Sequence, residues 1–530
     1  MPHILFTAIP AWGHIRPFCI LAARLAKENE ALTFTLLLPA NTMKKAEDEV
    51  SSELRENAEV KKRIRIFTCA KASSANPFEA MRDFVAAYPT IYEAIVQGTP
   101  VTCAESGTVF DGLDPPEVVI ADFFAAQQFT SMKGISGDKI PIFNFITGHA
   151  ASNIRMFGPE VLGGSGNLSA KMEAMSERLG IPIEAPGEKL YRATLGTSGT
   201  IVKLPGVPEM YDYEFYPQIL PFEGPLSLVL KGAYEFLKAC DGLIAVNAHC
   251  WEEDAINALK FWFADWDKKA YAIGPLLPES LGLLEQSPRG ADDIKVFLET
   301  VQAKRGKGSV LLISFGTTFW PSDPTYLEEI VEALMEKDFP FILCHASPFA
   351  KVSDALVNKV KQSGIGLLTK WCPQQYILDH PATGWFLTHC GNNSVTEALG
   401  SGVPMIAWPF EADQPATAYQ LTSMNLAIEL LEVRVGEHAV KPLRRNGKAA
   451  KGTREAVGAE IRSVIDLCRG ERGIAMKENA EKMKEEMKKA WSVDGPARKE
   501  VNAFLSSYTS LDVSGAVTKD SCWVKSYFKK

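Results

Sequence analysis

The sequence predicts an α/β protein of two consecutive halves, each built around a mostly parallel β-sheet. Two observations support this fold class. Short apolar runs rich in β-formers alternate with stretches of helical spacing, which is the pattern of parallel βαβ units. A segment containing Pro, Gly and Ser, ending at about residue 291, separates two such series. Two Rossmann-like halves that face each other would enclose a deep cleft, because ligands bind at the carboxyl ends of parallel strands.

The first series opens with a strand at 3–8, a loop at 10–14 and a helix at 17–27. The other segments of this half expected to contain strands are 31–41, 116–124, 140–147, 241–260 and 270–280. We expect loops over 70–100 and 150–240, and a surface connector at the Pro- and Tyr-rich stretch 204–218. This half therefore has regular strands and less regular connections.

The second series has the same alternation of strands and helices. Its strand-containing segments are 309–319, 340–346, 384–402 and 403–410. Residues 474–490 place Met476, Met483 and Met487 at helical spacing, a pattern typical of core packing. We therefore expect a first domain at 1–280, a linker at 281–307, a second domain at 308–490, a further helix at 491–508 and a tail at 509–530.

Composition excludes several classes of protein. Of the 530 residues, 46% are hydrophobic and 23% are charged, which is typical of a globular protein. The net charge of −8 argues against a dedicated nucleic-acid binder, which would show a basic face. The sequence contains no apolar run of ~20 residues, so we expect no integral membrane segment. The first residues lack the features of a signal peptide, and the ten cysteines form no CxxC pair, so we expect reduced thiols and a cytoplasmic protein.

The most informative segment runs from Trp371 to Gln414. A strand ends at residues 386–388, the polar turn His389-Cys390-Gly391-Asn392-Asn393-Ser394 follows, and a helix starts at 395. A helix N-terminus favours a bound anion by ~0.3–2 kcal/mol. Trp371 precedes Pro373 at a loop edge, where its ring could stack on a base for ~1–3 kcal/mol. Together these features predict a cradle for a nucleoside diphosphate.

This segment resembles the signature of the family 1 UDP-sugar-dependent glycosyltransferases, especially the plant-type enzymes. The resemblance extends to GHIRP (13–17), AIGPL (272–276) and ISFGT (313–317), and covers nearly residues 1–508. It implies the GT-B fold, in which the 491–508 helix packs back on the first domain. One position departs from the pattern, because Asn392 stands where plant members usually carry Trp.

The resemblance also implies roles for individual residues. Trp371 would stack on uracil, the Cys372 backbone would pair with its edge, and Glu397 with Gln374 would hold the ribose. Asp413, Gln414 and Thr147 would contact the transferred sugar. The residues implied to bind UDP are Gly316, Thr317, Trp371, Cys372, Gln374, His389, Gly391, Asn392, Asn393, Ser394 and Glu397.

The first half carries a candidate acid–base pair. His14 follows a predicted strand, and Asp122 ends another. In a parallel sheet both would lie at the same edge. An Asp that accepts from one imidazole nitrogen fixes the tautomer and stabilises the imidazolium formed on proton transfer. From the residues alone, this pairing is one option among several. The resemblance implies it, with His14 as the base and Asp122 as the carboxylate that accepts from His14.

The implied reaction is an inverting transfer of a sugar, glucose first, from a UDP-sugar to a hydroxyl of a small lipophilic or phenolic acceptor. We expect a monomer with no cofactor and no metal. The alternatives are a sugar-nucleotide epimerase of the same architecture and a non-catalytic nucleotide-sugar-binding protein.

Three other motifs are discounted. Asp265-Trp266-Asp267 is a DxD triplet, which we interpret as surface charge. Asn167 heads a glycosylation sequon expected to be idle without a secretory signal. The basic stretch 441–454 is expected to be a solvated loop.

The metal expectation predicts that EDTA leaves sugar transfer largely intact, because a helix N-terminus and a polar turn, and no cation, would stabilise the departing diphosphate. Initial rates before and after chelation measure this, with Asp265→Asn as a parallel variant that should behave like the wild type. Activity lost to EDTA and restored by Mg²⁺ or Mn²⁺ would contradict the prediction.

Overall fold

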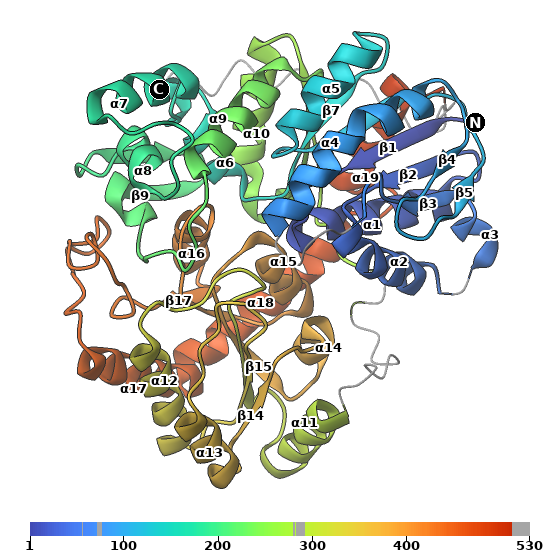
Figure 1. The fold of residues 1–530 in the computed structure, drawn as a ribbon. Coiled ribbons are helices and arrows are strands. Elements are labelled where there is room, and N and C mark those ends of the chain that lie inside the picture. The colour runs from blue at the N-terminus through green and yellow to red at the C-terminus, as the bar shows by residue number, and fades with distance from the viewer. Residues whose placement is uncertain (56, 72–76, 279–280, 282–291, 511–530) are drawn as a thin grey trace.

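The computed structural model describes residues 1–55, 57–71, 77–278, 281 and 292–510, with the backbone alone described at 77–80. It contains two parallel sheets, one in each half (Figure 1). In spatial order the first sheet is β11 (Lys269–Gly274), β10 (Gly242–Ala248), β7 (Ile142–Ile146), β6 (Val118–Asp122), β1 (His3–Thr7), β2 (Thr33–Leu37) and β3 (Ile64–Phe67). The second is β14 (Gly366–Thr369), β13 (Phe341–Cys344), β12 (Val310–Ser314), β15 (Thr383–Thr388), β16 (Met405–Ala407) and β17 (Ala427–Glu429).

Both sheets are covered on both faces, as all-parallel sheets require. Successive residues of β1 alternate between two cores: Leu5 belongs to one, and Ile4 and Phe6 belong to the other. The register pairs Thr7 with Ala121 on the neighbouring strand β6. The carboxyl ends of β1 and β6 therefore meet at one edge of the sheet, and the chain that follows each strand begins there.

Helices provide the covering layers. Those of the first half are α1 (Trp12–Glu28), α2 (Ala40–Leu54), α3 (Ala58–Lys61), α4 (Pro77–Val96), α5 (Ala126–Ser136), α6 (Ala150–Phe157), α7 (Leu168–Leu179), α8 (Lys189–Leu195), α9 (Leu226–Ala239) and α10 (His249–Asp265). Those that follow are α11 (Asp292–Arg305), α12 (Pro324–Glu336), α13 (Asp354–Ser363), α14 (Gln374–Asp379), α15 (Asn392–Ser401), α16 (Gln414–Ser423), α17 (Arg454–Arg469), α18 (Glu471–Lys489) and α19 (Pro496–Tyr508). No helix of the described residues is both long and apolar enough to cross a bilayer.

The chain crosses between the halves twice. The first crossing follows β11, and the second lies between α18 and α19. After it, α19 packs against β11, and Phe504 contacts Phe143 and Tyr271 at ring-centroid distances of 5.1 and 5.5 Å. The Trp491 indole donates Nε1–H to the Pro275 carbonyl at 2.9 Å, so the two crossings touch each other.

Several connections differ from the sequence-based expectation. The stretches 70–100 and 150–240 contain helices where loops were expected, namely α4 in the first and α6 to α9 in the second. Phe84, Tyr88, Tyr92 and Phe157 are buried in the first core. Within the expected linker, α11 buries Ile294, Leu298 and Val301 in the core of the second half.

The expectation of a surface connector at 204–218 is wrong. This segment contains the hairpin β8 (Ile201–Leu204) and β9 (Val207–Tyr211), followed by the 3₁₀ turn η2 (Asp212–Phe215). Tyr213, Phe215 and Tyr216 are buried, and the Tyr213 hydroxyl donates to the Pro442 carbonyl of the second half at 2.6 Å. There the Glu214 carboxylate accepts the backbone N–H of Tyr211 at 2.9 Å and of Arg444 at 2.8 Å.

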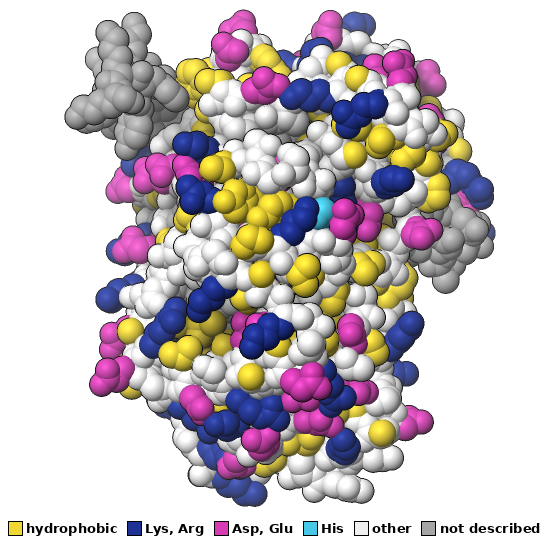
Figure 2. All heavy atoms as spheres, turned by 90° about the vertical axis from the view of Figure 1, so that its left-hand side faces the viewer, with side chains coloured by type: hydrophobic (Ala, Val, Ile, Leu, Met, Phe, Trp, Pro, Cys, Tyr) yellow, Lys and Arg dark blue, Asp and Glu magenta, His cyan; other side chains and the backbone are white. Residues whose placement is uncertain are grey.

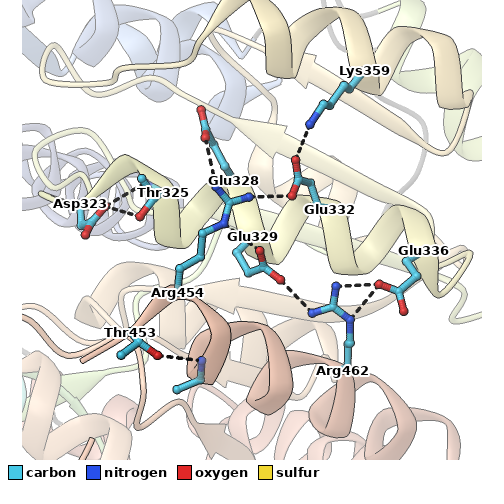
Figure 3. Close-up of polar contacts among 11 residues, drawn as sticks. Asp323, Thr325, Glu328, Glu329, Glu332, Glu336, Lys359, Thr453, Arg454 and Arg462 are labelled. Atoms are coloured by element: carbon cyan, nitrogen blue, oxygen red, sulfur yellow. Dashed lines mark hydrogen bonds and ion pairs between the residues drawn. The ribbon is translucent and has the colours of Figure 1, made fainter. Parts of the chain in front are cut away.

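The basic stretch 441–454 is irregular, as expected, but its arginines are not free in solvent. Arg445 pairs with the buried Glu429 at 2.5 Å. Arg454, the first residue of α17, pairs with Glu329 and Glu332 on α12, and Arg462 pairs with Glu329 as well (Figure 3). The ion pairs of Arg454 and Arg462 join α17 to α12.

Charges of both signs are interspersed over the face of the described residues that Figure 2 shows, without an extended basic patch on it. The DxD residues Asp265 and Asp267 are exposed at the end of α10. Asn167 caps α7 by accepting the backbone N–H of Ala170 at 3.1 Å.

The packing of α19 generates a prediction. Phe504→Ala should lower the free energy of opening of β11 by ~3–5 kcal/mol, because it removes a buried aromatic ring. Hydrogen exchange followed by mass spectrometry should show faster exchange in peptides covering β11 and unchanged exchange in β15. Ser506→Ala on the exposed side of α19 is the matched control, and equal exchange in both variants would contradict the prediction.

Candidate active site

His14 and Asp122 meet at the carboxyl edge of the first sheet. α1 begins at Trp12, so His14 lies in the first turn of a helix and not in the loop before it. Its Nδ1 lies 2.6 Å from Oδ2 of Asp122, the last residue of β6. The Asp122 side chain is fully buried, and its Oδ1 accepts the backbone N–H of Phe124 at 3.0 Å. With Nδ1 donating to this fixed carboxylate, neutral His14 has its lone pair at Nε2.

The electrostatics of this pair favour a basic imidazole. Burial disfavours the charged ring, but the Asp122 carboxylate, its hydrogen bond and the Asp413 carboxylate outweigh burial and raise the pKa of His14. A group of this kind can take a proton in a reaction near neutral pH. Phe123 and Phe124 lie beside it, with ring centroids 5.3 and 5.6 Å from the imidazole. His14 therefore lies beside two aromatic rings.

Glu397 is the centre of a polar cluster in the second half. It lies on α15 and is buried, with its Oε2 accepting Gln374 Nε2–H at 2.7 Å. The same amide group donates to Ser394 Oγ at 3.2 Å. Oε1 accepts Gln375 Nε2–H at 3.1 Å and a guanidinium N–H of Arg16 from the first half. Three residues expected to share a site are thus brought together, and two partners, Gln375 and Arg16, join them.

His389 lies between two glycines. A Cβ on Gly316 would lie 2.9 Å from the His389 ring, and a Cβ on Gly391 would lie 2.4 Å from it, so only glycine fits at both positions. Gly316 has φ +73°, a conformation that also favours glycine. Burial lowers the pKa of His389 to about 4, so the ring is neutral at pH 7. Its buried Nδ1 has no hydrogen-bond partner among the described residues, which fits a ligand oxygen.

The amides of the polar turn reach across the junction. Asn392 Nδ2–H donates to the Thr147 carbonyl at 2.8 Å, and Asn393 Nδ2–H donates to the Gly13 carbonyl at 2.7 Å. A Cβ on Gly13 would lie only 3.1 Å from this Asn393 amide. The side chain that replaces the usual Trp therefore joins the two halves in this structure, and α1 and α15 meet at their first turns.

Asp413 and Gln414 lie at the start of α16. Asp413 Oδ2 accepts the backbone N–H of His149 at 3.3 Å, and burial raises the pKa of Asp413 to about 6. The Gln414 Oε1 accepts the backbone N–H of Phe410 at 2.9 Å. Gln414 therefore holds its own loop with its oxygen, while Asp413 lies close enough to His14 to raise the pKa of the imidazole.

The remaining expected residues differ in accessibility. Trp371 is 58% exposed, and Thr317 is exposed as well. Cys372 and Thr147 are buried. Within the described parts of the chain, no group of three or more His, Cys, Asp or Glu side chains could hold a metal ion.

Sequence reasoning missed several residues of this junction. The Glu411 carboxylate accepts hydrogen bonds from the Tyr191 hydroxyl and, at 2.6 Å, from Nη2–H of Arg192. Buried His149 contacts Gln420 Oε1 through Nε2 at 2.6 Å. Arg16 belongs to the GHIRP motif. A charged residue so close to the candidate base was the signal that could have indicated a role for it.

Comparison with known proteins finds similar enzymes. The family model described as "UDP-glucoronosyl and UDP-glucosyl transferase" matches residues 275–441. The UDP-glycosyltransferase eriJ of Hericium erinaceus is 29% identical over 523 residues, which is 95% of this chain and 98% of the relative. The UDP-glucosyltransferase UGT13248 of Hordeum vulgare is 32% identical over 346 residues, which is 64% of this chain and 66% of the relative.

The fold is that of a solved plant enzyme. The structure of Phytolacca americana UGT2 complexed with UDP-2fluoro-glucose and pterostilbene superposes with a TM-score of 0.65 at 20% identity, and the match covers 96% of this chain and 100% of that one. Two facing parallel sheets, the match of the family model and a relative aligned along nearly its whole length lead to one conclusion: the chain belongs to the family 1 UDP-glycosyltransferases, enzymes of GT-B fold that transfer a sugar from a UDP-sugar to a small-molecule acceptor.

Proposed function

We propose that this enzyme transfers glucose with inversion from UDP-glucose to a hydroxyl of a small lipophilic or aromatic acceptor, with His14 as the base. The observation that carries the proposal is the 2.6 Å contact between His14 Nδ1 and the buried Asp122 carboxylate. Family membership favours transfer over the epimerase and the non-catalytic binding protein.

The chemistry follows from the two nitrogens of His14. Nε2 accepts the proton of the acceptor hydroxyl while the oxygen forms a bond to the anomeric carbon of the sugar. The bond from that carbon to the diphosphate oxygen breaks on the opposite face, and UDP departs with its electron pair. Asp122 stabilises the imidazolium that forms. Much of the acceleration comes from holding acceptor and donor in line.

We propose that the second half holds the donor. The exposed Trp371 indole offers a face for uracil and the Cys372 backbone pairs with its edge, while Glu397 with Gln374 receives the ribose. His389, Gly391, Asn392, Asn393, Ser394, Gly316 and Thr317 surround the diphosphate, with His389 acting as a neutral hydrogen-bonding group, given its low pKa. Asp413, Gln414 and Thr147 lie on the side toward His14 and contact the sugar.

The acceptor class is inferred from the surroundings of the base. Phe123 and Phe124 are the aromatic rings next to His14, and Phe124 is only half-buried. An apolar ring can pack there with its hydroxyl directed at Nε2. A cytoplasmic monomer that needs no metal remains our expectation for this enzyme.

The base role predicts a particular pH dependence. The imidazole must be neutral to act, so kcat/KM should fall as the pH falls through the raised pKa of His14, above 6.5. Asp122→Asn removes the carboxylate that raises this pKa, so the acid limb should move to lower pH while the plateau rate falls. His14→Ala should lower kcat by roughly 10²–10⁴, with UDP affinity nearly unchanged.

Rates from pH 5 to 9 for the wild type and both variants, with UDP affinity from calorimetry, measure these effects. A wild-type acid limb that Asp122→Asn leaves in place would remove the pair from the mechanism. Near-normal turnover by His14→Ala on a weakly acidic hydroxyl would do the same.

The donor site predicts a preference for UDP-glucose over its 4-epimer, UDP-galactose. A site that hydrogen-bonds a hydroxyl can reject an analogue that misplaces it by up to ~10⁴-fold, because buried polar groups lose their partners. Since Asn392 is smaller than the usual Trp, UDP-xylose and UDP-N-acetylglucosamine should be tolerated better than UDP-galactose.

Initial rates with these four donors, for the wild type, Asp413→Asn and Gln414→Ala, test this preference. Gln414→Ala should lower the discrimination between glucose and galactose. If its donor ratios match those of the wild type while its thermal stability falls, Gln414 only holds the loop at Phe410 and does not recognise the sugar.

A further inference from the structure

We infer that Arg16 is a positioning residue of the nucleotide site: it comes from the first half and orients Glu397 for the ribose, so that ribose recognition depends on contact between the halves. The inference rests on the proposed function, because it takes the ribose of UDP as the ligand of Glu397. Arg16 follows the proposed base by two residues on α1, and no motif of the sequence analysis gave it a role.

Arg16 is held at both ends by carboxylates. Its Nε–H donates to Glu49 Oε1 on α2 at 2.8 Å, and its Nη1–H donates to Glu397 Oε1 on α15. The exposed fractions of the Arg16 and Glu397 side chains are 16% and 6%, so water screens this pair little. The two glutamates raise the pKa of Arg16, although burial opposes its charge. The guanidinium therefore stays charged and bridges the two halves.

The hydrogen bonds at Glu397 show what this bridge does for a ligand. A carboxylate offers about four acceptor positions, two on each oxygen. Arg16 and Gln375 take those on Oε1, and Gln374 takes one on Oε2. The position left on Oε2 can accept one ribose hydroxyl. With Oε1 held by a cation, the carboxylate is fixed in orientation and remains an acceptor.

The neighbouring contact joins the same two helices. Asn393 on α15 donates to the Gly13 carbonyl at 2.7 Å, one residue before His14. When the first turns of α1 and α15 meet, Arg16 reaches Glu397 and His14 reaches the sugar side of the cleft together. Separation of the halves would leave Glu397 with amide partners only. The ribose site is complete in the state that also brings the base to the donor.

The test measures whether Arg16 changes the discrimination between ribose and deoxyribose. Calorimetry gives Kd for UDP and 2′-deoxy-UDP, and separately for 3′-deoxy-UDP, with the wild type, Arg16→Gln, Glu49→Gln and Glu397→Gln. We expect the wild type to prefer UDP over at least one deoxy analogue by roughly 10–100-fold, which corresponds to a hydrogen bond with a charged group. Arg16→Gln should bring that ratio to within about 3-fold of unity and raise the KM for UDP-glucose more than that for the acceptor.

Glu49→Gln is the matched control. Its amide oxygen can still accept from Arg16 Nε, so it should keep the wild-type ratio. Arg16→Lys, which keeps the charge but cannot bridge both carboxylates, should lower the ratio partially and serves if Arg16→Gln does not fold. Equal weakening of UDP and the deoxy analogues in both Arg16 variants would show a purely structural ion pair and overturn the inference.

Glu397→Gln separates this inference from the proposed function. If Glu397→Gln loses the preference and the Arg16 variants keep it, Glu397 binds the ribose without Arg16, and the inference fails alone. If Glu397→Gln keeps the full preference, the ribose role proposed for Glu397 fails. A higher ratio in Arg16→Gln would mean that Arg16 competes with the ribose, which also overturns the inference.

Discussion

The Asp413 carboxylate links the two halves by a hydrogen bond and by its charge. It belongs to the second half, but it accepts the backbone N–H of His149 from the first and contributes to the raised pKa of His14. Burial raises its own pKa to about 6, so its negative charge is held at a cost in desolvation. Backbone donors of both halves, from His149 and Asn392, partly offset that cost. The acid–base properties of one half therefore depend on the presence of the other.

The junction differs in kind from the cores beneath the two sheets. Each core is closed by aliphatic and aromatic side chains. The junction adds charged and amide pairs, such as Glu411 with Arg192 and His149 with Gln420, to a few apolar contacts such as those of Tyr419 and Trp251. Interfaces of this polarity resemble those of transient complexes more than domain interiors. Polar partners can exchange a protein contact for water or a ligand at small net cost, which apolar partners cannot. The chemistry of the junction suits a cleft that must admit two substrates and release two products.

The sequence predicted the parts of this molecule that depend on local pattern. Buried parallel strands appear as short apolar runs, so β1, β6 and β15 were recognisable, and Asp122 at the end of its strand followed from them. The turn at His389 was recognisable because its residues are contiguous. The hairpin β8–β9 was not, because its Pro- and Tyr-rich composition resembles that of a loop and β9 packs against α16 of the second half.

Contacts between distant segments were also beyond the sequence. Arg16 and Glu397 are separated by 381 positions, and nothing in the neighbourhood of either residue indicates the other. The hydrogen bond from the Asn392 amide to the Thr147 carbonyl also joins distant segments. Such pairs depend on how two finished domains meet, which hydrophobic periodicity does not encode. The charge of Arg16 inside the GHIRP motif was the local sign that this residue would need a partner.

The contact between Trp491 and Pro275 constrains how the halves can move. Two chain connections far apart from each other would allow little rotation of one half relative to the other. Because they touch, they form a double hinge at one place, and the main remaining freedom is rotation about an axis through that place. A rotation of this kind moves groups far from the axis most, and it separates the halves without sliding one past the other. The halves can therefore meet repeatedly in the same register, which the hydrogen bonds across the junction require.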